Sequence, residues 1–157
     1  MTGSEILKSM VASQEADAIF KASGGEDSLP ELGQSSVRVA DSRTWKFKNQ
    51  DGISVNVFVL SGECVDGPSK GEAFQKSIYQ NMDSDGRFLK QLIKGLGATP
   101  SSVGGGQSFI QDCAFVNDAL VGKDALIQLT VGNYEIKKGK RAGQVIRVIE
   151  DATVVKG

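Results

Sequence analysis

Residues 37–63, VRVADSRTWKFKNQDGISVNVFVLSGE, predict an antiparallel β-hairpin. In the first half of this stretch, four apolar side chains share one parity: Val37, Val39, Trp45 and Phe47. An alternation with a period of two is typical of a strand that buries one face. The Asp51-Gly52 step that follows is a strong signal for a hairpin turn.

The second half of the hairpin repeats the alternation. One parity holds four β-branched residues: Ile53, Val55, Val57 and Val59. Phe58 falls on the opposite parity, among polar residues. We therefore expect Phe58 to face away from the valines, as an exposed ring.

A second hairpin is predicted over residues 125–150, ALIQLTVGNYEIKKGKRAGQVIRVIE, because both ends are rich in Val, Ile, Leu and Thr. Four cations surround Gly139 in the loop between them: Lys137, Lys138, Lys140 and Arg141. No acid lies between Glu135 and Glu150. This concentration of positive charge points to a polyanionic partner.

The remaining patterns complete an order of strands and helices. A third strand is expected over residues 73–82, a helix over 87–97 opened by the acidic turn 83–86, and a short helical piece over 108–120. An amphipathic helix is expected over residues 4–22, followed by a linker rich in Gly, Ser and Pro. That first helix docks on the body, pairs with a partner, or is partly mobile; the pattern does not decide.

This order predicts a mainly β protein with a five-stranded OB-fold-like Greek-key barrel. One helix lies between strands 3 and 4, the piece at 108–120 is an addition before strand 4, and a further helix precedes the barrel. A small β-sandwich and a split α+β sheet are the alternatives.

Composition limits the function classes. The chain has 157 residues and no histidine, so it suits one main core and lacks the commonest general base and metal ligand. Cys64 and Cys113 are the two cysteines, which we interpret as reduced thiols. We expect no signal peptide, and no apolar run is long enough to span a bilayer, so a cytoplasmic location without membrane contact is expected. We expect no catalytic residues, no metal site and no cofactor.

Charge divides the chain into two parts. Residues 1–33 hold two lysines against six acids, a net charge of −4, whereas residues 34–157 hold 16 cations against 13 acids, a net charge of +3. We therefore expect an acidic N-terminal helix and linker over residues 1–33 and a nucleic-acid-binding domain over residues 34–157.

Two segments resemble a known family. They are IYQNMDSDGRFLKQLIKGLGA, residues 78–98, and ALVGKDALIQLTVGNYEIKKGKRAGQVIRV, residues 119–148. Over roughly residues 36–155 the chain is similar to phage-encoded OB-fold single-stranded-DNA-binding proteins of replication and recombination cassettes, a family formerly of unknown function. The resemblance implies a viral protein, working in the host cytoplasm, that coats and protects single-stranded DNA.

Binding a single strand requires cations for phosphates and aromatic faces for bases. The candidate residues for these roles are Arg43, Trp45, Lys46, Phe58, Lys76, Tyr79, Tyr134, Lys137, Lys138, Lys140 and Arg141. Phe74, Phe88, Phe109 and Phe115 are expected in the core. Other replication or recombination proteins and a second copy of the chain are further candidate partners.

The alternative interpretation is a non-enzymatic protein–protein adaptor, for example a phage structural or assembly subunit with a small β-barrel. In that case the first helix docks on a neighbouring subunit and the basic loop neutralises an acidic partner.

Overall fold

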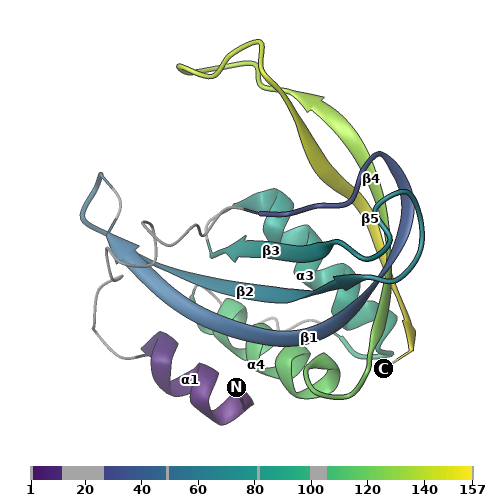
Figure 1. The fold of residues 1–157 in the computed structure, drawn as a ribbon. Helices are drawn as coiled ribbons and strands as arrows, with labels where there is room; N and C mark the ends of the chain where they lie inside the picture. Colours follow the sequence, from purple (N-terminus) through teal and green to yellow (C-terminus); the bar gives the residue numbers. More distant parts are fainter. Residues whose placement is uncertain (1, 12–26, 49, 81, 100–105, 157) are drawn as a thin grey trace.

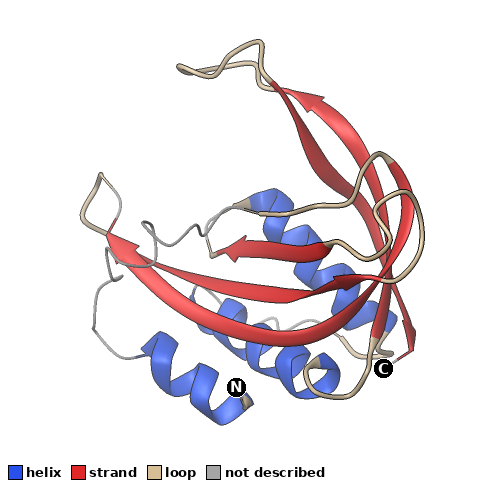
Figure 2. Ribbon diagram, viewed as in Figure 1, coloured by secondary structure: helices blue, strands red, loops and turns tan. Residues whose placement is uncertain are grey.

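The computed structural model describes residues 2–11, 27–48, 50–80, 82–99 and 106–156. Within these ranges it contains a five-stranded antiparallel sheet and helices that cover one of its faces (Figure 2). The elements in chain order are α1 (Gly3–Val11), β1 (Gly33–Lys48), β2 (Ser54–Cys64), β3 (Ala73–Tyr79), α3 (Asp83–Gly95), α4 (Gly106–Leu120), β4 (Leu126–Glu135) and β5 (Val145–Lys156).

The strands are ordered β3-β2-β1-β4-β5, and the sheet is open (Figure 1). Both predicted hairpins are confirmed, since β1 pairs with β2 and β4 pairs with β5. β1 also pairs with β4 through its first half. The predicted closure into a barrel is wrong, because β3 and β5 end the sheet without pairing with each other.

A β-bulge in β1 lies between Val39 and Asp41, where the pairing with β2 shifts by one residue. The bulge reverses the parity of the strand, because an extra residue turns all later side chains to the other face. Val37 and Val39 are therefore buried before it, whereas Ser42 and Lys46 are buried after it. The expectation that Trp45 and Phe47 share a face with these valines is wrong for this reason.

The hydrophobic core lies between the sheet and all three described helices. α3 contributes an apolar stripe, with Phe88, Leu89, Leu92 and Ile93 at most 3% exposed. Phe74 is buried as predicted, and Phe109 packs partly buried against the core. Phe115 does not follow its prediction, because it lies 43% exposed on the outer side of α4.

The N-terminal helix docks on the body. The backbone N–H of Gly3 donates to Asp118 Oδ1 of α4 at 2.7 Å, and Ile6 is fully buried in the common core. The predicted continuation of this helix over residues 12–22 lies outside the described residues. In the described part of the chain, every helix is too short or too polar to cross a bilayer.

The hairpin of β4 and β5 extends away from the body (Figure 1). Its loop is closed by backbone hydrogen bonds between Ile136 and Gln144 and between Gly143 and Ile136. Gly139 and Gly143 both have positive φ, of 86° and 88°, a conformation that strongly favours glycine. The sequence therefore holds the four loop cations in a defined turn.

Candidate nucleic-acid interface

Residues 27–29, called the strap below, lie along the outer edge of β3. Ser28 exchanges two backbone hydrogen bonds with Gln75 of β3, at 2.9 and 3.0 Å. On the other side, the guanidinium of Arg147 in β5 donates to the carbonyl oxygen of Leu29 at 3.3 Å. The strap thus links the two edges of the sheet that a closed barrel would join directly.

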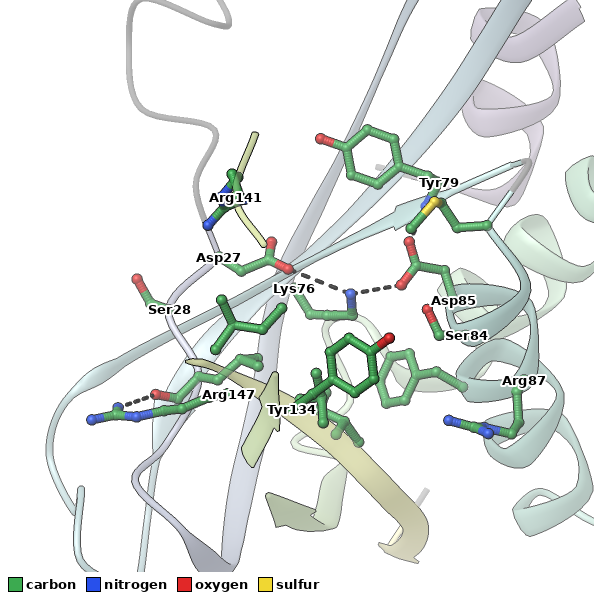
Figure 3. A pocket seen from close by; sticks show the side chains of 16 residues that line it. Asp27, Ser28, Lys76, Tyr79, Ser84, Asp85, Arg87, Tyr134, Arg141 and Arg147 are labelled. Atoms are coloured by element: carbon green, nitrogen blue, oxygen red, sulfur yellow. Dashed lines mark hydrogen bonds and ion pairs between the residues drawn. The ribbon is translucent and has the colours of Figure 1, made fainter. Parts of the chain in front are cut away.

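An open groove of about 1180 Å³ lies beside the strap (Figure 3). One wall is formed by the strap, the end of β3 and the start of α3, and the other by the β4–β5 hairpin. The tyrosine and cationic side chains that line it are Lys76, Tyr79, Arg87, Tyr134, Arg141 and Arg147. Two tyrosines and four cations from distant parts of the sequence therefore share one depression.

Three arginines give the groove its accessible positive charge. Arg87, at the start of α3, Arg141, in the hairpin loop, and Arg147, on β5, are all exposed. The Nε of Arg141 donates to Gln144 Oε1 at 2.7 Å, which orients this guanidinium within its own loop. Guanidinium groups bind phosphate oxygens through paired N–H donors, so these residues suit a polyanion.

Lys76, one of the candidate binding residues, lines the groove, but two carboxylates neutralise it (Figure 3). Its ammonium lies 2.7 Å from Asp85 Oδ1 and 3.4 Å from Asp27 Oδ2. Asp85 also accepts the backbone N–H of Tyr79 at 2.9 Å, so it ties β3 to the first turn of α3. In this arrangement the charge of Lys76 stabilises the contacts of β3 with α3 and with the strap.

The two tyrosines of the groove differ in their surroundings. Tyr134 is 49% exposed. Tyr79 is half-buried and packs edge-on against Trp45 and Phe47, with ring centroids 6.3 and 6.1 Å away. Burial raises the pKa of the Tyr79 hydroxyl, and the nearby charges of Asp27 and Asp85 add to this. Tyr79 is consequently a neutral ring at physiological pH, anchored by its aromatic neighbours.

The basic loop is divided between the groove and the tip of the hairpin. Arg141 lines the groove, whereas Lys137, Lys138 and Lys140 are exposed beyond it. Lys137 Nζ lies 3.4 Å from Glu135 Oε2, an exposed pair that contributes little to stability. The three lysines thus extend the positive surface outward from the groove.

Two predicted contact residues are buried instead. Phe58 is fully buried in the core between the sheet and the helices, so the expectation of an exposed ring is wrong. The valines on the other parity are buried as well, because β2 is covered on both faces. Lys46 is 7% exposed, and burial lowers the pKa of its ammonium. The reversal of parity at the β-bulge explains the burial of Lys46.

Arg43 and Trp45 lie near the groove without lining it. They share the face of Tyr79, because both come from positions of β1 that are odd-numbered after the bulge. The guanidinium of Arg43 donates to Gln75 Oε1 at 2.9 Å. Trp45 is half-buried in the ring trio with Phe47 and Tyr79.

Sequence reasoning missed Arg87, Arg147 and the strap. Arg147 is the single charge within the apolar run Val145–Ile149, which is an unusual pattern for a strand. Arg87 directly follows the acidic turn that opens α3, where a basic residue does not complement the helix dipole. Both patterns are visible in the sequence, whereas nothing in the acidic linker indicates that its end contacts β3.

No protein-family model matches the chain, and no curated protein matches it.

Proposed function

We propose that the protein binds single-stranded DNA without enzymatic activity and coats it during DNA replication or recombination. The observation that carries this proposal is the convergence of Tyr79 and Tyr134 with Arg87, Arg141 and Arg147 in one open groove. Rings that stack bases and cations that follow the phosphates are the two requirements for binding an unpaired strand.

The chemistry of the groove favours a single strand over a duplex. A tyrosine ring can stack only on a base whose face is free, and bases in a duplex already stack on one another. Guanidinium groups contact phosphates of any sequence, so binding of this kind tolerates every base. The protein then covers transient single strands and shields them from nucleases and from refolding.

The arrangement of strands supports a relationship to the OB-fold, whose barrel is partly open in many members. β1 pairs with both β2 and β4, and α3 is the first of two helices between β3 and β4. In this interpretation, the strap occupies the position where the third and fifth strands approach each other. The resemblance of residues 36–155 extends the proposal to a phage protein that acts in the host cytoplasm.

The test is a fluorescence-anisotropy titration with labelled oligothymidine and with a duplex of equal length, at several salt concentrations. The wild type is expected to prefer the single strand, with a log–log salt slope of about −0.7 per phosphate neutralised. Replacing Lys137, Lys138, Lys140 and Arg141 together by alanine is expected to weaken binding and to flatten the slope by up to about 2.8.

A matched control keeps the change in net charge the same. Lys70, Lys90, Lys94 and Lys123 are exposed and lie outside the groove, so their joint replacement by alanine removes four cations elsewhere. The loop variant is expected to lose much more affinity than this control. Equal losses, or equal affinity of the wild type for duplex and single strand, would contradict the proposal.

A further inference from the structure

The carboxylate of Asp27 is held by three donors on β3. Its Oδ1 accepts the backbone N–H of Ser77 at 2.6 Å, and its Oδ2 lies 3.4 Å from Lys76 Nζ. The hydroxyl of Ser77 also hydrogen-bonds to this carboxylate. We call these three groups, the backbone N–H and hydroxyl of Ser77 and the ammonium of Lys76, the β3 cradle.

The β3 cradle has the composition of a phosphate site. Backbone N–H groups, hydroxyls and basic side chains are the donors by which proteins contact the phosphates of nucleic acids. The ammonium of Lys76 and the carboxylate of Asp27 line the groove, as do the exposed arginines, and Ser77 follows Lys76 in β3. In the described structure, the oxygens of Asp27 occupy the place that phosphate oxygens would take.

The carboxylate is a weak occupant of this place. Burial raises the pKa of Asp27, and this effect outweighs the opposite effects of Lys76 and of the Ser77 hydrogen bonds. The ionised carboxylate is therefore less stable in the cradle than in water. Its side chain is still 29% exposed, so water and a competing anion can reach it.

We propose that the β3 cradle is a subsite for one backbone phosphate of the bound strand, and that the carboxylate of Asp27 fills it until the strand displaces it. This rests on the proposed binding of single-stranded DNA. The strap thereby tunes affinity, because every strand that enters the cradle must first displace an internal competitor.

Replacing Asp27 by alanine removes the competitor and leaves the donors of β3 in place. Oligothymidine is expected to bind Asp27→Ala at least about ten-fold more tightly than wild type, since one charge-assisted phosphate contact is gained. The log–log salt slope is expected to steepen by about 0.7, the contribution of one phosphate. The amide resonance of Ser77 is expected to shift during the titration.

Glu31→Ala is the matched control. It makes the same change in charge close to the strap, but the side chain of Glu31 is exposed, and Glu31 contacts the body through its backbone N–H, which donates to Ser69 Oγ. If Asp27→Ala binds no more tightly than Glu31→Ala, or if its slope equals that of wild type, the subsite is wrong. Should Asp27→Ala unfold, Asp27→Ser, whose side chain is too short to bridge Ser77 and Lys76, is measured with the same expectations.

A second arm separates this inference from the proposed function. If neither the wild type nor Asp27→Ala binds oligothymidine, the proposed function is wrong, and the wild type, Asp27→Ala and Glu31→Ala are titrated with inorganic tripolyphosphate. A saturating shift of the Ser77 amide in Asp27→Ala, absent in Glu31→Ala, would then support a phosphate site in the cradle. The absence of any shift in Asp27→Ala would overturn the cradle as well.

Discussion

Lys76 and Asp85 form an ion pair that joins β3 to α3, with the ammonium nitrogen 2.7 Å from Asp85 Oδ1. Both side chains are largely buried, at 14% and 6% exposure. Asp85 additionally accepts the backbone N–H of Tyr79, so one carboxylate fixes both the end of the strand and the ring that lines the groove. The wall of the groove thus depends on this pair.

Replacing Lys76 by methionine is expected to lower the free energy of unfolding by about 3–5 kcal/mol, the usual cost of leaving a buried charge without its partner. The measurement is urea denaturation at neutral pH. Lys76→Met combined with Asp85→Asn is expected to recover part of the loss, because the more buried of the two carboxylates that lose Lys76 is then uncharged. A loss below about 0.5 kcal/mol in Lys76→Met would mean that the pair contributes no more to stability than an exposed salt bridge does.

Replacing Phe58 tests an aromatic ring in the core, whereas replacing Tyr134 tests an aromatic ring proposed to stack on a base. Phe58→Ala is expected to reduce the free energy of unfolding by about 3–5 kcal/mol, since it empties a fully buried position. Tyr134→Ala, at an exposed position, is expected to change stability by less than about 0.5 kcal/mol. The same variant is expected to weaken the binding of oligothymidine by about 1–3 kcal/mol through the loss of one stacked base.

Urea denaturation measures the first two effects and anisotropy the third. Unchanged affinity in Tyr134→Ala would remove this ring from the interface. A small loss of stability in Phe58→Ala would contradict its position in the core.

Alternation predicted the strands, but it did not predict which face each one buries. The hairpin turn was readable because Asp51-Gly52 suits the positive φ of 74° that Gly52 adopts. The β-bulge after Val39 was not readable, because the residues around it look like an uninterrupted strand. One extra residue moved Lys46 into the interior and turned Trp45 to the other face, so the errors for these two residues have a common origin.

The groove was only partly predictable for a different reason. Tyr134 and Arg141 are close in sequence, so the basic loop and its preceding ring were found together. Asp27 and Ser77, in contrast, are 50 residues apart, and their contact depends on the strap reaching the free edge of β3. Pairing across an open edge leaves no periodic signal in the strap itself.

The raised pKa of Asp27 predicts a specific dependence of stability on pH. The pKa of Asp27 in the folded protein lies above the ordinary value of 3.8, so the folded state favours the protonated carboxyl group. The contribution of this group to the free energy of unfolding is therefore fully present below pH 3.8 and is lost as the pH rises through the folded pKa. The charged or titratable neighbours of Asp27 are Lys76, Asp85 and Tyr79. They are unchanged in Asp27→Asn, which lacks the titrating group.

Urea denaturation of wild type and Asp27→Asn at several pH values between 3.5 and 7 (a range of about three units above the usual pKa of Asp) measures this effect. The free energy of unfolding of wild type relative to Asp27→Asn is expected to fall as the pH rises. A relative stability that increases with pH would mean that Lys76 dominates over burial and that the ionised carboxylate is a strong occupant of the cradle.

Gly62 is required where β2 passes the β-bulge of β1, because a Cβ there would lie 1.9 Å from the carbonyl oxygen of Arg38. A backbone atom cannot move aside as a flexible side chain does, so Gly62→Ala is expected to lower the free energy of unfolding by about 1–3 kcal/mol or more. Gly86→Ala in α3 is the control, since nothing lies within 4 Å of its Cβ and alanine favours a helix by up to about 1 kcal/mol. In thermal and urea denaturation, Gly62→Ala is therefore expected to be less stable than wild type and Gly86→Ala more stable. If Gly62→Ala is as stable as wild type, the strands can separate at the bulge without cost, and the bulge does not fix the parity of β1 that buries Lys46.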